Sequence, residues 1–82
     1  MKVIEEGDKF TLKRNNIDHG YLYFNKEANH LIIKEVFVYP GYRGNGFGKL
    51  LVDHVVLEGK EKSLSVLAEC SFAKLFVKDK KR

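Results

Sequence analysis

The chain has 82 residues, of which 44% are apolar and 32% charged, and it carries a formal net charge of +4. A chain of this length and composition builds one small hydrophobic core, which excludes a disordered or multidomain protein. With one cysteine, apolar runs of only a few residues and no signal-peptide pattern after Met1, it excludes a disulfide scaffold and a membrane span, so we expect a single cytoplasmic domain over residues 1–82.

Four segments in the first half of the chain carry strand patterns, with short polar turns between them: Lys2 to Glu5, Lys9 to Lys13, Ile17 to Phe24 and His30 to Val38. In the second segment, Phe10 and Leu12 alternate with polar residues, which is typical of a strand with one buried face. Asn15-Asn16 forms one connection, since asparagine tolerates left-handed backbone angles, and a polar loop over residues 25–29 forms another. Connections this short predict antiparallel hairpins.

The second half of the chain is patterned as helix, strand and helix. Side chains from Phe47 to Glu58 recur at the i, i+3, i+4, i+7 spacing of an amphipathic helix that packs on the sheet. We expect this helix to end near Glu58, because Gly59 can adopt the left-handed conformation of a C′ residue. Residues 64–68 alternate as a final strand, and Ser71 offers an N-cap to a short helix.

The expected order of elements is therefore β-β-β-β-α-β-α. Two strands joined by a helix lie parallel and cross over right-handedly, whereas strands joined by hairpins lie antiparallel. The expected fold class is α+β, with a mixed, mostly antiparallel sheet.

The most informative stretch, Tyr39 to Lys49, joins the fourth strand to the first helix. Pro40 donates no backbone hydrogen bond and so ends the strand. Glycines at alternate positions follow, Gly44, Gly46 and Gly48, and without a Cβ they let an anion approach the main chain. The N-terminus of the next helix adds unpaired N–H groups and a partial positive charge of about half an electron. This loop predicts a phosphate site, against the plainer interpretation of a flexible turn.

The segment Arg43 to Gly48 resembles the Arg/Gln-x-x-Gly-x-Gly/Ala pattern of the acetyl-CoA site in GNAT-type N-acetyltransferases, and Val38-Tyr39-Pro40 resembles their usual V-x-P strand end. Residues Ala68 to Lys74 resemble the cysteine-containing segment of a small branch of that family. The resemblance implies a minimal GNAT-like (acyl-CoA N-acyltransferase) fold, without the helices that usually wall the acceptor side. It also implies acetyl-CoA as co-substrate, bound by Val38, Arg43, Gly44, Asn45, Gly46, Gly48, Lys49 and Phe72. For Lys49, a solvent-facing position on the helix is an equal alternative.

Cys70 is the first candidate for a catalytic role. It ends the last predicted strand and precedes a predicted helix N-terminus, where the helix dipole stabilises a thiolate. The resembled branch places this cysteine next to the thioester, and exchanging the CoA thioester for a cysteine thioester is close to neutral in energy. The alternative is structural, because free cysteines are commonly buried as small apolar residues.

Glu35 is the second catalytic candidate, and we expect it on the same face of its strand as Ile33 and Phe37. If it faces the cleft, partial desolvation would suit it to act as a general base; the alternative is a solvated or ion-paired acid. Larger GNAT enzymes often use a strand glutamate to deprotonate the acceptor amine. The small branch often carries a His-Thr pair near this point, where this chain has Glu35-Val36.

These patterns predict an N-acetyltransferase acting on an unidentified amine acceptor, and the alternative is a non-catalytic CoA-binding or regulatory module. The excess of 15 Lys and Arg over 11 Asp and Glu favours an anionic partner, which the phosphates of CoA supply. Nucleic acid is not the expected partner, since the chain shows no aromatic–basic recognition motif. We expect no metal site, because His19, His30 and His54 form no cluster, and we expect a monomer or weak homodimer with a solvated tail over Lys78 to Arg82.

Overall fold

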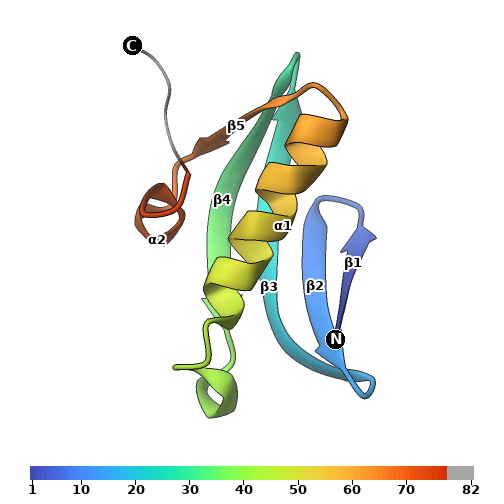
Figure 1. Cartoon of the computed structure of the whole chain (residues 1–82), viewed down its shortest axis with the longest axis vertical. Helices are drawn as coiled ribbons and strands as arrows, with labels where there is room; N and C mark the ends of the chain where they lie inside the picture. Colours follow the sequence, from blue (N-terminus) through green and yellow to red (C-terminus); the bar gives the residue numbers. More distant parts are fainter. Residues whose placement is uncertain (78–82) are drawn as a thin grey trace.

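The computed structural model describes residues 1–77 and contains a five-stranded sheet and two helices (Figure 1). The elements, in chain order, are β1 (Lys2–Glu6), β2 (Lys9–Arg14), β3 (Ile17–Glu27), β4 (His30–Val38), the 3-10 turn η1 (Pro40–Tyr42), α1 (Phe47–Glu61), β5 (Ser65–Ala68) and α2 (Ser71–Lys74). The tail predicted over residues 78–82 lies outside the described residues. Neither helix of residues 1–77 combines the length and the apolar character needed to cross a membrane.

The strands lie side by side in the order in which they occur in the chain. From β1 to β4 the neighbours are antiparallel, and β5 pairs parallel with β4. Figure 1 shows α1 lying along one face of the sheet, as the crossover between the two parallel strands, with α2 beyond β5. This arrangement confirms the α+β class and the mixed, mostly antiparallel sheet that the sequence predicts.

The hydrophobic core lies between one face of the sheet and the two helices. Strand alternation and the helical repeat bring together Phe10, Leu12, Leu22, Phe24, Leu31, Ile33, Leu51, Val52, Val55 and Ala73. Burying one Leu, Val or Phe side chain stabilises a fold by about 1.5–3 kcal/mol. These contacts hold α1 on the sheet and so fix the position of the loop that precedes it.

The pairing of β5 with β4 covers only the first part of β4. Paired positions run from His30↔Ser65 to Ile33↔Ala68, and the ladder ends with a hydrogen bond of 2.9 Å from the Glu69 N–H to the Ile33 carbonyl. Beyond this point the chain leaves β5 toward α2, while β4 continues to Val38. The two parallel strands therefore diverge, and the end of β4 has a free edge.

Helix α1 runs past its predicted end, so the prediction of Gly59 as a left-handed C′ residue is wrong. Gly59 is buried inside the helix, and a Cβ added there would lie 2.5 Å from Cγ2 of Val66. The glycine lets α1 approach β5 closely. The positive φ instead falls at Ser63, with a value of 57°.

Two other boundaries differ from the sequence-based expectation. Strand β3 continues beyond Phe24 to Glu27, because the turn is made by Ala28, which has a φ of 51°, and by the residue after it. Ser71 is the first residue of α2, and Cys70 occupies the N-cap position without a side-chain capping hydrogen bond. The expected cap at Ser71 is therefore wrong by one residue.

Candidate functional site

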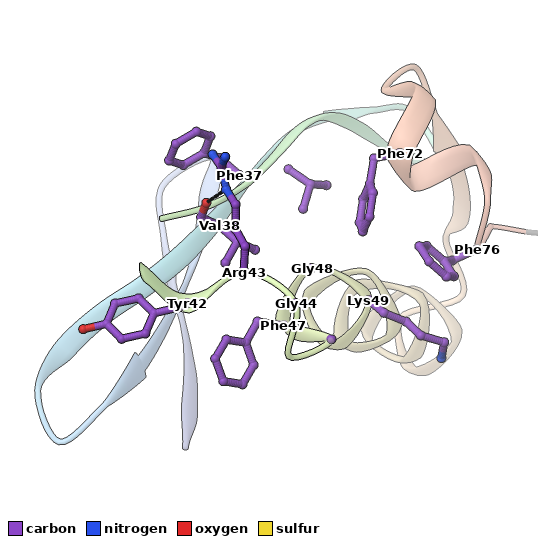
Figure 2. A pocket seen from close by; sticks show the side chains of 12 residues that line it. Phe37, Val38, Tyr42, Arg43, Gly44, Phe47, Gly48, Lys49, Phe72 and Phe76 are labelled. Carbon is purple, nitrogen blue, oxygen red and sulfur yellow. Dashed lines mark hydrogen bonds between the residues drawn. The ribbon is translucent and has the colours of Figure 1, made fainter. Parts of the chain in front are cut away.

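A cleft of about 570 Å³ opens beside the free edge of β4 (Figure 2). Its volume lies within the range of small-molecule sites in proteins. Four parts of the chain wall it: the end of β4, the loop after β4, the first turn of α1, and the α2 segment. The lining residues are Val36, Phe37, Val38, Tyr42, Arg43, Gly44, Gly46, Phe47, Gly48, Lys49, Phe72 and Phe76.

The free edge of β4 presents main-chain hydrogen-bonding groups to this cleft. The Tyr39 N–H donates to the His19 carbonyl at 3.0 Å, which shows that Tyr39 bonds toward β3. In antiparallel pairing, residues that bond to the neighbour alternate with residues whose main chain points away. The main chains of Val36 and Val38 therefore point to the open edge, and the Val38 carbonyl accepts a bond of 2.7 Å from Nε of Arg43. Val36 and Val38 both line the cleft, so this edge of the strand borders it.

Two glycines of the loop have backbone angles that favour glycine over other residues. Gly44 has a φ of 85°, and Gly46, the N-cap of α1, has a φ of 77°. A Cβ added at either position would meet no atom within 4 Å, so the main chain here borders open space. The loop therefore leaves room for a group to approach its backbone.

The first turn of α1 directs free N–H groups toward the same space. The helix ladder begins with the Leu50 N–H, which donates to the Gly46 carbonyl at 3.0 Å. The N–H groups of Phe47, Gly48 and Lys49 precede this first bond and so have no partner within the helix. Together with the helix dipole, they make the helix end a site suited to an anion such as phosphate.

Gly48 differs from the other two glycines of the predicted phosphate loop. It is buried in the first turn of α1, and a Cβ added there would lie 2.7 Å from the ring of Phe72. Figure 2 shows Phe72 reaching from α2 toward this turn. In this structure Gly48 lets the Phe72 ring close one wall of the cleft, which is a packing role that the sequence pattern did not predict.

The polar side chains predicted to bind the cofactor interact mainly with the chain itself. The guanidinium of Arg43 bonds to Val38 and lies 5.0 Å from the centroid of the Phe37 ring. Nδ2 of Asn45 donates to the Tyr42 carbonyl at 3.2 Å, and Asn45 is not among the residues that line the cleft. The ammonium of Lys49 pairs with the Asp53 carboxylate at 2.7 Å on the exposed surface of α1. Arg43 and Asn45 thus shape the loop.

His19 is a buried residue that supports the loop, a role that the sequence does not predict. Its ring stacks on Tyr42 with a centroid distance of 3.7 Å and packs edge-on against Phe47 at 5.5 Å. Its Nδ1 lies 2.9 Å from the Ile17 carbonyl, and only 6% of the residue is exposed. His19 thus joins β3 to two residues that line the cleft. In the sequence, His19 is a strand residue beside Gly20. That position does not predict a contact with Tyr42, which lies 23 positions later in the chain.

The structure places the two catalytic candidates on opposite faces of the sheet. Cys70 is half-buried and packs against the core, on the side of the helices. A β-bulge between Tyr23 and Phe24 pairs these residues with Glu35 and Ile33, so Ile33 faces the core and Glu35 the opposite side. The expectation that Ile33 and Glu35 share one face is therefore wrong. Neither Cys70 nor Glu35 is among the residues that line the cleft.

Glu35 interacts with a tyrosine on its own face of the sheet. The Tyr21 hydroxyl donates to Oε2 of Glu35 at 3.4 Å. Partial burial, together with the neighbouring Glu35 charge, raises the pKa of Tyr21 above its ordinary value. This shift favours the protonated phenol, which is the form that donates a hydrogen bond to the carboxylate.

Comparison with known proteins is consistent with this geometry. A model of the GCN5-related N-acetyl-transferase family matches residues 9–82. No curated protein matches the chain. A solved structure of a GCN5-like protein from Staphylococcus aureus aligns with a TM-score of 0.71 and 28% identity, over 90% of this chain and 74% of that one.

Two further solved structures share the fold at lower identity. A ribosomal-protein-alanine N-acetyltransferase from Brucella melitensis biovar Abortus aligns with a TM-score of 0.76 and 13% identity, over 90% of this chain and 65% of that one. An aminoglycoside N-acetyltransferase in complex with CoA aligns with a TM-score of 0.63 and 16% identity, over 90% of this chain and 69% of that one. The family model covers residues 9–82, which is most of this chain. The chain therefore belongs to the GCN5-related N-acetyl-transferase family.

Proposed function

We propose that this protein binds acetyl-CoA in the cleft and transfers the acetyl group to an amine. The observation that carries the proposal is the continuity between the free edge of β4 and the glycine-bordered N-terminus of α1. CoA carries a pyrophosphate and a pantetheine arm next to each other, as the helix N-terminus and the strand edge are. Its pyrophosphate suits the free N–H groups of the helix end, and the amides of its pantetheine arm suit the main chain of Val36 and Val38.

The residues present fit the coenzyme at the phosphate end. Gly44 and Gly46 border open space, so the phosphate oxygens can reach the main chain without meeting a Cβ. Phe72 and Phe76 give the cleft an apolar wall on the side of α2. The net charge of +4 adds a general attraction for the coenzyme's phosphates.

The acetyl end of the coenzyme then reaches the point where β4 and β5 diverge. Ile33 and Ala68 form the last pair of the two strands. Glu35 and Cys70 each follow that pair by two residues, on the two faces of the sheet. Both catalytic candidates thus lie near the point where β4 and β5 diverge, which is the proposed position of the thioester. Neither residue lines the cleft itself.

Two routes of transfer follow from these positions. In the first, the Cys70 thiolate attacks the thioester carbonyl, the bond to the CoA sulfur breaks, and the acceptor amine then displaces the cysteine. In the second, the amine attacks the thioester directly while Glu35 takes its proton and CoA leaves as a thiolate. Both routes give an N-acetyl product and CoA.

The two routes are distinguished by incubating the protein with acetyl-CoA and no acceptor, followed by mass spectrometry. A cysteine route leaves one acetyl group on Cys70 that hydroxylamine removes, and Cys70→Ala loses turnover while keeping coenzyme affinity. A direct route leaves no adduct, and Glu35→Gln slows turnover by about 10²–10⁴-fold, less at high pH where the amine is already neutral.

A panel of amines with acetyl-CoA tests the transferase proposal itself. Consumption of the thioester only in the presence of an amine supports it. A protein that acetyl-CoA stabilises against heat but that consumes no thioester with any amine would be a coenzyme-binding module, and the proposed transfer would be wrong.

A further inference from the structure

Four aromatic side chains share the face of the sheet that lies opposite α1 and α2. Tyr21 pairs with Phe37, and their side chains alternate with those of Leu22 and Val36, which pack with the core. The ring of Tyr21 lies 5.1 Å from that of Tyr23, 5.4 Å from that of Phe37 and 6.2 Å from that of Tyr39, between centroids. We call Tyr21, Tyr23, Phe37 and Tyr39 the aromatic face.

The aromatic face is partly open to solvent and lies next to charged groups of both signs. Tyr23 is 36% exposed and the other three residues are half-buried. Glu35 lies directly opposite Tyr23 in the sheet register. The Lys9 ammonium lies 5.8 Å from the Tyr23 ring centroid and 6.0 Å from that of Tyr21. These distances are close to the limit of about 6 Å for a cation–π contact, so the Lys9 ammonium interacts only weakly with the two rings.

The aromatic face is continuous with the cleft across a single strand. Glu35 and Phe37 project to one side of β4, and Val36 and Val38, between and after them, present their main chains to the free edge. β5 pairs with β4 only as far as Ile33. A molecule lying on the aromatic face can therefore reach the edge of β4 without passing through a paired strand.

We infer that the aromatic face binds the acceptor, and that the acceptor is a primary amine joined by a short alkyl chain to one aromatic ring. This inference rests on the proposed function. The ring of the acceptor lies against Tyr21 and Tyr23, because the Arg43 guanidinium lies over the Phe37 ring, and the amine is directed to the Glu35 carboxylate. Successive residues on one strand face are about 7 Å apart, so two neighbouring tyrosines of this face can contact a single aromatic ring.

Acetyl transfer to such an acceptor is the attack of an amine on a thioester. The amine nitrogen forms a bond to the acetyl carbon, the bond from that carbon to sulfur breaks, and the sulfur leaves as a thiolate. Of the two protons on the neutral amine, one stays on the amide and the other passes to Glu35 and then to the thiolate. An arylalkylamine and acetyl-CoA thus give an N-acetyl arylalkylamine and CoA.

The direct test measures amine binding to the protein saturated with CoA, which carries no acetyl group, so that no turnover occurs. The probes are 2-phenylethylamine and butylamine, which differ by the ring, titrated by NMR. We expect 2-phenylethylamine to bind about three- to tenfold more tightly, the effect expected of one aromatic contact. Tyr23→Ala removes this preference. Leu57→Ala, which shortens a residue of α1 that is 56% exposed, is the matched control and keeps it.

Lys9→Met provides a second variant whose effect cannot come from damage to the fold. Removing the Lys9 ammonium frees the rings of Tyr21 and Tyr23 and removes a repelling charge, so both amines should bind several-fold more tightly. Equal binding of the two amines to the parent, or parent-like binding by both Tyr23→Ala and Lys9→Met, overturns the inference. So does a parent dimer that Tyr23→Ala turns into a monomer without changing amine affinity, since a second copy would then cover the face.

Turnover separates this inference from the proposed function. Ring-dependent binding without any thioester consumption would leave the aromatic face as an amine site and overturn the transfer. If Tyr23→Ala and the parent turn over with the same KM for the amine, the proposed acetyl transfer stands. The inference that the aromatic face is the acceptor site is then wrong.

Discussion

At the scale of single residues, Gly46 and Gly48 lack side chains for two different reasons. Gly46 has a φ of 77° and borders open space, where we propose that the phosphates bind. Gly48 has an ordinary φ and lies under the Phe72 ring. One motif glycine therefore borders open space, and the other allows the Phe72 ring to pack closely against the helix.

Replacing Gly46 by Val should remove most of the rise in Tm that acetyl-CoA produces, because the branched side chain enters the space beside the helix N-terminus. For the parent, ligand at about 100 times Kd adds about 2.7 kcal/mol of stability. Thermal denaturation with and without acetyl-CoA measures the effect, with circular dichroism to show that the variant folds. Gly41→Ala is the control, because Gly41 lies in the same loop outside the cleft lining. A folded Gly46→Val protein with the parent's shift would move the coenzyme site elsewhere.

His19→Ala should weaken acetyl-CoA binding several-fold although His19 touches no predicted ligand position. The substitution removes the stacking contact with Tyr42 and leaves the Ile17 carbonyl without its partner, at a cost of about 1–2 kcal/mol in the free protein. Isothermal titration calorimetry gives the affinity. His19→Phe keeps a ring against Tyr42 and should recover most of the affinity. An unchanged Kd in His19→Ala would show that the loop holds its shape without this support.

At the scale of elements, the contact between α1 and β5 depends on Gly59. Gly to Ala in a helix interior usually stabilises a protein by about 0.5–1 kcal/mol. We expect the opposite sign here, because the new Cβ would lie 2.5 Å from Cγ2 of Val66 and 3.2 Å from the Leu64 carbonyl oxygen. Overpacking of this kind costs about 1–3 kcal/mol. Urea denaturation of Gly59→Ala measures whether the free energy of unfolding falls, as we expect. The double variant with Val66→Ala, which removes the contacting methyl groups, is measured in the same way. If Gly59→Ala alone is more stable than the parent, the two elements are less closely packed than described.

The C-terminal turn of α1 should make stability depend on pH through Glu58. A hydrogen bond from Lys62, with its charge, holds the pKa of Glu58 below the ordinary value of 4.5. A carboxyl group with a lowered folded-state pKa stabilises the fold above its unfolded pKa and loses this contribution as the pH falls through the folded value.

Glu58→Gln and Lys62→Met should each therefore lose less stability than the parent when the pH is lowered from about 6 to about 3. Urea denaturation at the two pH values measures the difference. Acid sensitivity as steep in both variants as in the parent would place the titrating groups elsewhere in the chain.

At the scale of the whole molecule, a net charge of +4 and a largely exposed loop make coenzyme binding sensitive to salt. Screening shortens the reach of exposed charges from about 30 Å at 0.01 M to about 3 Å at 1 M. The Kd for acetyl-CoA should rise steadily over this range, whereas the Kd for a pantetheine fragment without phosphates should change little. Parallel behaviour of the two ligands would argue against a phosphate site at the helix end.

The placement of both helices on one face of the sheet also decides how open the molecule is. Both helices pack on one face, so a sheet of only five strands exposes its other face over residues 1–77. The resemblance to GNAT enzymes predicts an open acceptor side, and we propose that the aromatic face forms it. Tyr21 and Tyr23 appeared in the sequence as ordinary strand residues, because period-2 alternation does not tell which face of a sheet a second layer will cover.

The sequence by itself determined the order of the elements and the place of the glycine-containing loop before α1, because both depend on local chemistry. Strand alternation, the helical repeat from Phe47 and the proline at position 40 act over a few residues. Gly44 and Gly46 were identified for the same reason, since a positive φ is a property of one residue and its neighbours.

Tertiary structure alone decided the positions that depend on contacts between distant segments. The bulge at Lys34 turned Glu35 away from the core, and the early end of the β4–β5 pairing opened the cleft. Burial of Gly59 against Val66 and stacking of His19 on Tyr42 have the same origin. A one-residue shift in pairing reverses the face of every later side chain on a strand, and no local pattern in the chain records where that shift occurs.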